Sequence, residues 1–246
     1  MQSCVAVITI VKSGSNLIGP LISQISGKST QYTPHPEFSL NMIDAGSIAI
    51  AHFFIKDSVD YIFSKSEFNK IVVNIRDPRD VLVSAAYYYL NPYSCLVDEN
   101  INSYNVEMHE SCYSKISIRD RLMLFLRPPS NFTSLAVYDI KAASKFLLQH
   151  RHDLGDRYLV VRYEDFINKD SRALDACCTL ADFLGYSCTR QFADECLETI
   201  VGSSLTFREG KSGSWKKFFD EEIKALCKEV LGDELIDLGY ELDLNW

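Results

Sequence analysis

The sequence predicts an α/β fold in which a central, mostly parallel sheet is flanked by helices. Apolar, β-type runs occur at residues 5–10, 47–51, 70–75 and 158–162, and each is followed by a loop and a stretch of helical spacing. Strands that alternate with helices form parallel sheets, because each helix returns the chain across a face of the sheet. A length of 246 residues suits one such domain, so we expect a single domain over residues 1–246.

The composition is typical of a soluble globular protein, with 47% hydrophobic and 24% charged residues. No uninterrupted apolar run approaches the roughly 20 residues that span a bilayer, and the N-terminal stretch lacks the basic leader of a secretory signal. We therefore expect a cytoplasmic protein without a membrane partner. The net charge of −8 disfavours nucleic acid as a partner and favours a small molecule that is neutral or cationic.

The eight cysteines and five histidines form no metal-binding pattern. Cys177 and Cys178 are adjacent, and neither a C-x-x-C nor an H-x-x-x-H spacing occurs. Because no export signal accompanies the cysteines, we expect reduced thiols rather than disulfides. We also predict that the protein holds no metal.

The loop after the first run has the residue types of an anion cradle. It reads Lys12-Ser13-Gly14-Ser15-Asn16 and leads directly into a helical stretch. A glycine between hydroxyl residues lets backbone N–H groups turn inward, and a helix N-terminus adds a positive partial charge. The Gly-Lys-Ser/Thr ending of a Walker A loop is absent. An ordinary turn is the alternative interpretation.

His52 follows the second run and is the candidate general base. A neutral imidazole at a strand end can accept a proton from a hydroxyl or amine. A histidine that merely packs against its neighbours is the alternative. His35, Glu37 and Glu107 are the other candidates for the same role.

The third run feeds a helix through a charged turn. Arg76 leaves the strand end, Pro78 fixes the turn, and Asp77 and Asp80 are placed where a helix N-terminus favours carboxylates. Ser84 lies about two turns into the helix. Arg76 and Ser84 can therefore bind one phosphate from two sides, although an ordinary cap with a surface pair of Arg76 and Asp80 is the alternative.

The ends of the four runs place reactive side chains at one edge of the sheet. Ligands of parallel α/β sheets bind beyond the carboxyl ends of the strands. Lys12, His52 and Arg76 lie at three of these ends, and Tyr163, which can both stack and hydrogen-bond, lies at the fourth. We expect these four side chains to converge.

A glycine-rich basic segment follows near the C-terminus. Arg208, Glu209 and Gly210 begin it, and Trp215 follows after a second glycine. Two glycines let the loop fold over an anion, the planar guanidinium suits a phosphate, and the tryptophan anchors the loop on the core. A flexible basic turn is the alternative.

In their order and spacing these segments resemble those of the PAPS-dependent sulfotransferases. The matches are Lys12, Ser13 and Gly14 in the front loop, Arg76, Pro78, Asp80 and Ser84 in the third segment, Tyr163 in the fourth, and Arg208, Gly210, Gly213, Trp215, Lys216 and Phe219 at the back. The resemblance covers nearly the whole chain. It implies a single-domain, P-loop-like sulfotransferase fold.

The resemblance also implies a reaction and its residues. PAPS would be the sulfuryl donor and PAP the product, bound by Lys12, Ser13, Gly14, Ser15, Asn16, Arg76, Ser84, Tyr163, Arg208, Glu209 and Gly210. His52 would be the base, Lys12 would neutralise charge on the departing phosphate, and Ser84 would contact both Lys12 and the 3′-phosphate. Residues 91–119, which are polar and weakly periodic, would form loops and helices around the acceptor.

Two other functions stay open from the sequence. The front loop also suits a small-molecule kinase that uses ATP. Leu17, Asn16 and Glu209 differ from the family pattern and keep open a non-catalytic protein that binds PAP or another nucleotide.

Overall fold

The computed structural model describes residues 4–32, 47–53, 59, 62–64, 68–88, 96–98, 116–128, 132–150, 152, 157–202 and 211–246. Its contacts divide the chain into two compact units, each of which combines two separate stretches of sequence. The first unit comprises Met1–Arg76 and His150–Lys211, and the second comprises Asp77–Gln149 and Ser212–Trp246. The α/β class is confirmed, while one domain over residues 1–246 stays a prediction.

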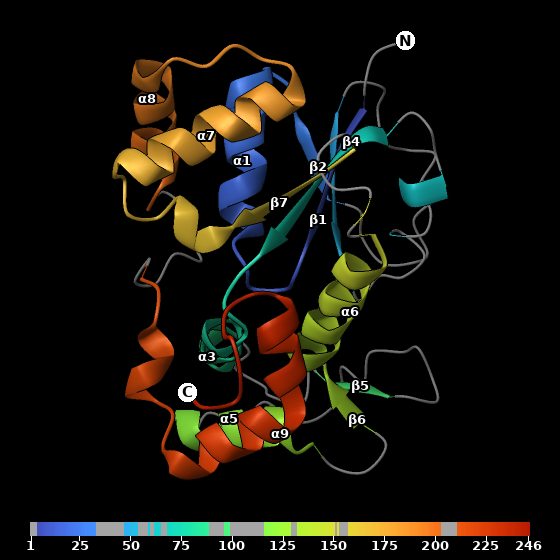
Figure 1. Cartoon of the computed structure of the whole chain (residues 1–246), viewed down its shortest axis with the longest axis vertical. Coiled ribbons are helices and arrows are strands. Elements are labelled where there is room, and N and C mark those ends of the chain that lie inside the picture. The colour runs from blue at the N-terminus through green and yellow to red at the C-terminus, as the bar shows by residue number, and fades with distance from the viewer. Residues whose placement is uncertain are drawn as a thin grey trace. The chain divides into compact units, whose positions relative to one another are not determined.

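A five-stranded parallel sheet is the centre of the first unit (Figure 1). Its order is β2-β3-β1-β4-β7, and every neighbouring pair is parallel. The strands are β1 (Cys4–Thr9), β2 (Thr30–Tyr32), β3 (Ile48–His52), β4 (Phe68–Ile75) and β7 (Tyr158–Arg162). The four predicted runs are confirmed as β1, β3, β4 and β7. The edge strand β2 was not predicted, because three residues are too few to show a periodic pattern.

Three helices of the first unit cover one face of this sheet (Figure 1). They are α1 (Ser15–Ser26), α7 (Ser171–Leu184) and α8 (Arg190–Ile200). Alternate strand residues such as Val5 and Val7 belong to the core beneath them. Ala6 on the opposite face is also fully buried. Burial of both faces is typical of parallel sheets and explains why the strands read as continuous apolar runs.

The helices of the first unit begin and end at local capping signals. The carboxylate of Asp170 accepts hydrogen bonds from two backbone N–H groups at the start of α7, and the hydroxyl of Thr189 caps α8. Gly27 and Gly185 end α1 and α7 in the left-handed conformation. Between its two caps, α7 confirms the helical stretch predicted after the fourth apolar run.

The strand order changes direction between β1 and β4. From β1 the chain continues to β2 and β3 on one side of β1, whereas β4 and β7 lie on the other side. Such a reversal separates the loops that leave the two adjacent strands and opens a crevice at their carboxyl ends. Lys12 and Arg76 follow these two strands.

The second unit combines helices with a small antiparallel pair of strands. Its elements are α3 (Pro78–Tyr88), β5 (Leu96–Asp98), α5 (Ile118–Leu126), β6 (Phe132–Ser134), α6 (Leu135–His150), the short 3₁₀ helix η4 (Ser214–Lys217) and α9 (Glu221–Asp237). The helix predicted after the third run is confirmed as α3. Strand β5 pairs with β6, so the expectation of only loops and helices over residues 91–119 was wrong there.

A search of the helices in the described ranges finds none with both the length and the apolar character that crossing a membrane requires.

Candidate active site

The loop between β1 and α1 has a strained shape with its glycine at the helix start. Lys12 has φ 63° and Gly14 has φ 97°, in the left-handed region that residues with a side chain rarely adopt. The carbonyl of Gly14 accepts the first two backbone hydrogen bonds of α1, from Leu17 and Ile18. No acidic residue occupies the first turn of α1, so its N-terminus keeps a positive partial charge that suits an anion.

A buried hydrogen-bond network fixes this loop to the sheet. The Oγ of Ser13 lies 2.6 Å from the Oγ1 of Thr9 and donates to the carbonyl of Ile10 at 2.6 Å. The Nδ2 of Asn74 in β4 donates at 3.1 Å to both hydroxyls and to the carbonyl of Ser13. Ser13 is fully buried, so its hydroxyl holds the loop in shape.

Asn74 was not predicted as part of the site. The signal for it was a single amide inside the apolar run of β4, where an unpaired polar group would be costly. Its two N–H groups have three acceptors within 3.1 Å, so the buried amide is fully hydrogen-bonded.

Tyr163 lies against the loop at its glycine. This tyrosine follows β7 as the first residue of the 3₁₀ helix η3 (Tyr163–Asp165) and is buried. A Cβ placed on Gly14 would lie 2.5 Å from the Cδ2 of the Tyr163 ring. Only glycine therefore allows both the backbone conformation and the approach of the ring.

Arg76 links the loop to the same tyrosine. Its Nη1 donates to the carbonyl of Lys12 at 3.1 Å, and its guanidinium carbon lies 4.3 Å from the centre of the Tyr163 ring. Its Nε is buried and has no hydrogen-bond partner, and no carboxylate in the described part of the chain pairs with it. A buried guanidinium N–H that lacks an acceptor is costly, and an anion would supply one.

The ammonium of Lys12 is half-buried beside this arginine. Burial lowers the pKa of Lys12 to about 8, and the positive charge of Arg76 adds to the effect. Two cations thus lie close together at one sheet edge. An anion bound there would favour the charged form of Lys12.

His52 ends β3 next to the end of β1, where it pairs in register with Thr9. Its Nδ1 lies 3.3 Å from the carbonyl oxygen of Thr9. A carbonyl only accepts, so this bond requires the proton on Nδ1 and leaves the lone pair on Nε2. Burial lowers the pKa of His52 to about 4; the Thr9 hydrogen bond opposes this, and the charge of Lys12 adds to it. The imidazole is therefore neutral at pH 7.

Tyr32 in β2 contacts the remaining residues of the loop. Its hydroxyl donates to the Oδ1 of Asn16 at 2.9 Å. Burial raises the pKa of Tyr32, and a hydrogen bond with Ser15 partly opposes the rise. Sequence reasoning missed this tyrosine, because β2 itself was not predicted.

In the second unit, Asp80 binds residues 213–215, at the end of the glycine-rich basic segment near the C-terminus. Its carboxylate accepts hydrogen bonds from the backbone N–H of Gly213 at 2.7 Å, the hydroxyl of Ser214 at 2.9 Å and the backbone N–H of Trp215 at 2.9 Å. Asp80 is 1% exposed, so it is not the surface residue of the alternative interpretation. Ser84, on the same helix, is half-buried.

Arg79 is held on every side by groups of the second unit. It makes two hydrogen bonds with Asp77, at 2.9 and 2.8 Å, and one with Glu241 at 2.5 Å. Its guanidinium carbon lies 4.1 Å from the ring centre of Trp215 and 4.5 Å from that of Trp246. Sequence reasoning missed this role, because Glu241 and Trp246 are distant in the chain.

Comparisons with known proteins identify the fold. No protein-family model matches the sequence, and no curated protein matches it. Among solved structures, mouse sulfotransferase SULT7A1 complexed with PAP is similar at a TM-score of 0.62 and 18% identity, over 96% of this chain and 85% of that one. Retinol dehydratase in complex with androsterone and inactive cofactor PAP is similar at a TM-score of 0.60 and 17% identity, over 94% and 80%. The chain has a sulfotransferase fold.

Within this sulfotransferase fold, the structure brings together four of the predicted site residues. Contacts join Lys12 to Arg76 and Arg76 to Tyr163, and place His52 beside Thr9 at the end of β1. The expected convergence at the carboxyl ends of the strands is therefore found. Several other candidates lie outside the described residues: Arg208, Glu209, Gly210, His35, Glu37 and Glu107.

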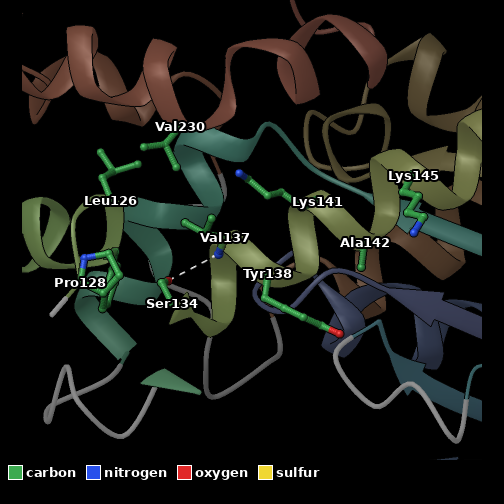
Figure 2. Close-up of a pocket in the computed structure, with 10 residues that line it drawn as sticks. Leu126, Pro128, Ser134, Val137, Tyr138, Lys141, Ala142, Lys145 and Val230 are labelled. Carbon is green, nitrogen blue, oxygen red and sulfur yellow. Dashed lines mark hydrogen bonds between the residues drawn. The ribbon is translucent and has the colours of Figure 1, made fainter. Parts of the chain in front are cut away.

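The second unit of the sulfotransferase fold also contains a cavity of about 540 Å³ (Figure 2). Apolar groups from α5, α6 and α9 line it, including Leu126, Val137 and Val230. Lys141 and Lys145, one turn apart on α6, line it as well. Both lysine side chains are exposed to solvent, so this cavity does not test the neutral or cationic acceptor expected from the net charge.

Proposed function

We propose that the protein is a PAPS-dependent sulfotransferase that moves a sulfuryl group to a hydroxyl or amine of a small molecule. The observation that carries the proposal is the buried Nε of Arg76 at the end of a parallel sheet, for which the described residues supply no acceptor. Lys12 and a helix N-terminus lie beside it, and Tyr163 offers an aromatic face. This set of groups suits a nucleotide with more than one phosphate.

The fit to PAPS can be assigned residue by residue. Lys12, Gly14, Ser15 and Asn16 would bind the phosphosulfate through the loop amides and side chains. Arg76 would bind the 3′-phosphate, and the resemblance adds Ser84, Arg208, Glu209 and Gly210 to the donor contacts. Tyr163 would contact the adenine. PAPS supplies an activated sulfuryl group when bound and leaves as PAP, so the chain itself needs no metal.

The roles of the chain's own groups follow from their protonation. Neutral His52 would take the proton of the acceptor O–H or N–H on Nε2, while Thr9 keeps the other ring nitrogen protonated. A bound anion nearby would raise the pKa of His52 and make it a stronger base. The Lys12 ammonium would offset charge that develops on the leaving phosphate, an effect of about 10²- to 10³-fold on turnover by analogy with single oxyanion donors.

The acceptor is proposed to be a small neutral or cationic metabolite, in keeping with the net charge of −8. The proposal keeps the expected cytoplasmic location and does not involve nucleic acid or a membrane.

Calorimetric titration with PAP and with ATP tests the donor. We expect PAP to bind at micromolar concentration and ATP much more weakly. Arg76→Met and Arg208→Ala should each weaken PAP binding at least tenfold, about 1.4 kcal/mol. Arg190→Met is the matched control, because this exposed arginine on α8 pairs only with a surface carboxylate. Tighter binding of ATP would overturn the proposal in favour of the kinase.

Release of PAP from PAPS over a panel of phenols, alcohols and amines tests catalysis. Lys12→Met and His52→Asn should lower turnover by at least 10²-fold while the protein stays folded. Lys224→Met is the control, because this half-buried lysine pairs with the exposed Glu221 on the surface of α9. Tight PAP binding without release over any acceptor would favour the non-catalytic nucleotide-binding protein.

A further inference from the structure

A group of thiols lies in the first unit outside the proposed site. Cys177 and Cys178 are on α7, Cys188 precedes α8, and Cys196 is on α8. Cys177 and Cys196 are fully buried, whereas Cys178 and Cys188 are half-buried. The Sγ atoms of Cys178 and Cys188 are 3.3 Å apart. None of these thiols has a part in the proposed transfer reaction.

We propose that Cys178 and Cys188 are a covalent modification site, at which a reversible intramolecular disulfide forms. A disulfide bond is about 2.05 Å long, so the two sulfur atoms must approach by little more than 1 Å. Cys188 lies in the connection between the end of α7 at Leu184 and the start of α8 at Arg190. A residue outside regular structure can make this adjustment through its own backbone and side-chain rotation.

The chemistry requires an oxidant, for which we take a small disulfide such as oxidised glutathione. The Cys178 thiolate attacks one sulfur of the small disulfide and releases one thiol. The Cys188 thiolate then attacks the mixed disulfide, forms the protein S–S bond and releases the second thiol. The two cysteines together lose two protons and two electrons. The small disulfide takes up all four and becomes two thiols.

The order of attack follows from the surroundings of the two thiols. Burial, together with the neighbouring Cys178 thiol, raises the pKa of Cys188 to about 11, which keeps this group protonated and a poor first nucleophile. Burial also raises the pKa of Cys177 to about 12. Cys177 is fully buried as well, so it is not the thiol that meets a solvent oxidant.

The cross-link would join two helices that support the front loop. α7 and α8 both pack with α1 in the core of the first unit, and α1 begins directly after Gly14. A bond between Cys178 and Cys188 closes a short ring at the turn between α7 and α8. The oxidised protein should therefore unfold at a higher denaturant concentration than the reduced protein.

The test is incubation with oxidised glutathione, followed by alkylation, intact mass measurement and peptide mapping. We expect wild type to lose two alkylatable thiols, to give a cross-linked peptide that contains Cys178 and Cys188, and to regain both thiols with dithiothreitol. Cys178→Ser and Cys188→Ser should each abolish the cross-link. Cys227→Ser, in α9 of the second unit, should leave it unchanged.

Two results would overturn the site. One is a stable mixed disulfide with glutathione at either cysteine and no cross-linked peptide. The other is an unchanged loss of two thiols in Cys178→Ser or Cys188→Ser, which would place the bond elsewhere. Circular dichroism of each variant shows that it is folded, and the denaturant midpoint of oxidised wild type gives a second measure. These results do not depend on whether the protein binds PAP.

Discussion

Arg76 and Arg79 lie three positions apart in one turn of the chain, and both are buried, yet their surroundings are opposite. Arg79 has carboxylates from Asp77 and Glu241 and an aromatic ring of Trp215 against its face. Arg76 has one carbonyl oxygen, the ring of Tyr163 and a buried Nε without a partner. Among the described residues, Arg79 has carboxylate partners, whereas Arg76 has none.

A buried charge with a structural role differs from a candidate ligand-binding charge in the partners that surround it. Burial and hydrogen bonding alone do not distinguish the two arginines, because both are buried and both donate. The difference is whether the chain itself supplies the opposite charge. A buried charge that the fold leaves uncompensated is a candidate for binding an ion of opposite sign.

Replacement of each arginine by methionine tests this difference most strongly. Arg79→Met should lower the free energy of unfolding by about 3 to 5 kcal/mol, because it leaves buried carboxylates without a partner. Arg76→Met should change it by about 1 kcal/mol or less, since only one hydrogen bond and one ring contact are lost. Chemical denaturation measures both.

Equal destabilisation by the two arginine replacements would contradict the distinction. Arg190→Met, which breaks an exposed ion pair on α8, should cost less than about 1 kcal/mol and serves as the reference.

Asp80→Asn tests a buried carboxylate whose partners all come from residues 213–215. The amide side chain keeps the size of Asp80 but replaces one accepting oxygen with a donor. This donor would face the backbone N–H groups of Gly213 or Trp215. We expect a loss of about 2 to 3 kcal/mol in the free energy of unfolding. Asp120→Asn is the control, because Asp120 is exposed in the first turn of α5. A loss no larger than that of the control would show that the Asp80 contacts contribute little.

His52 should contribute to acid sensitivity. The pKa of His52 is about 4 in the folded protein and about 6.5 when unfolded, so between these values only the unfolded state holds the extra proton. Stability from this group is complete above pH 6.5 and is lost as the pH falls toward 4. Wild type should therefore lose about 2 kcal/mol more than His52→Asn over this interval. Parallel profiles of unfolding free energy against pH would refute this assignment.

Lys12 should give the smallest effect, at alkaline pH. With its pKa at about 8, the ammonium of Lys12 is mostly charged at pH 7 and mostly neutral at pH 9. Since phosphates are fully ionised over this interval, PAP affinity should fall about tenfold, or 1.4 kcal/mol, between pH 7 and 9. Calorimetry at several pH values measures the fall. Lys12→Met should bind PAP more weakly at pH 7 and show little dependence on pH, and a steep fall in this variant would assign the effect to another group.

Elements with local signals could be predicted from the sequence alone. Apolar runs gave β1, β3, β4 and β7, and helical spacing with capping residues gave α1, α3 and α7. The rule that ligands bind at the carboxyl ends of parallel strands then brought Lys12, His52, Arg76 and Tyr163 to one edge, where the structure has them. These predictions succeeded because periodicity, caps and strand ends are properties of neighbouring residues.

Which charged and polar side chains pair with one another depends on the tertiary structure. Glu241 neutralises Arg79 although 162 residues separate them, and Asp80 accepts the N–H of Trp215 across 135 residues. The inward turn of the Ser13 hydroxyl toward Asn74 depends equally on a distant strand. Such partners are brought together by the packing of segments remote in sequence, so only the tertiary structure shows which charges have a partner among the described residues.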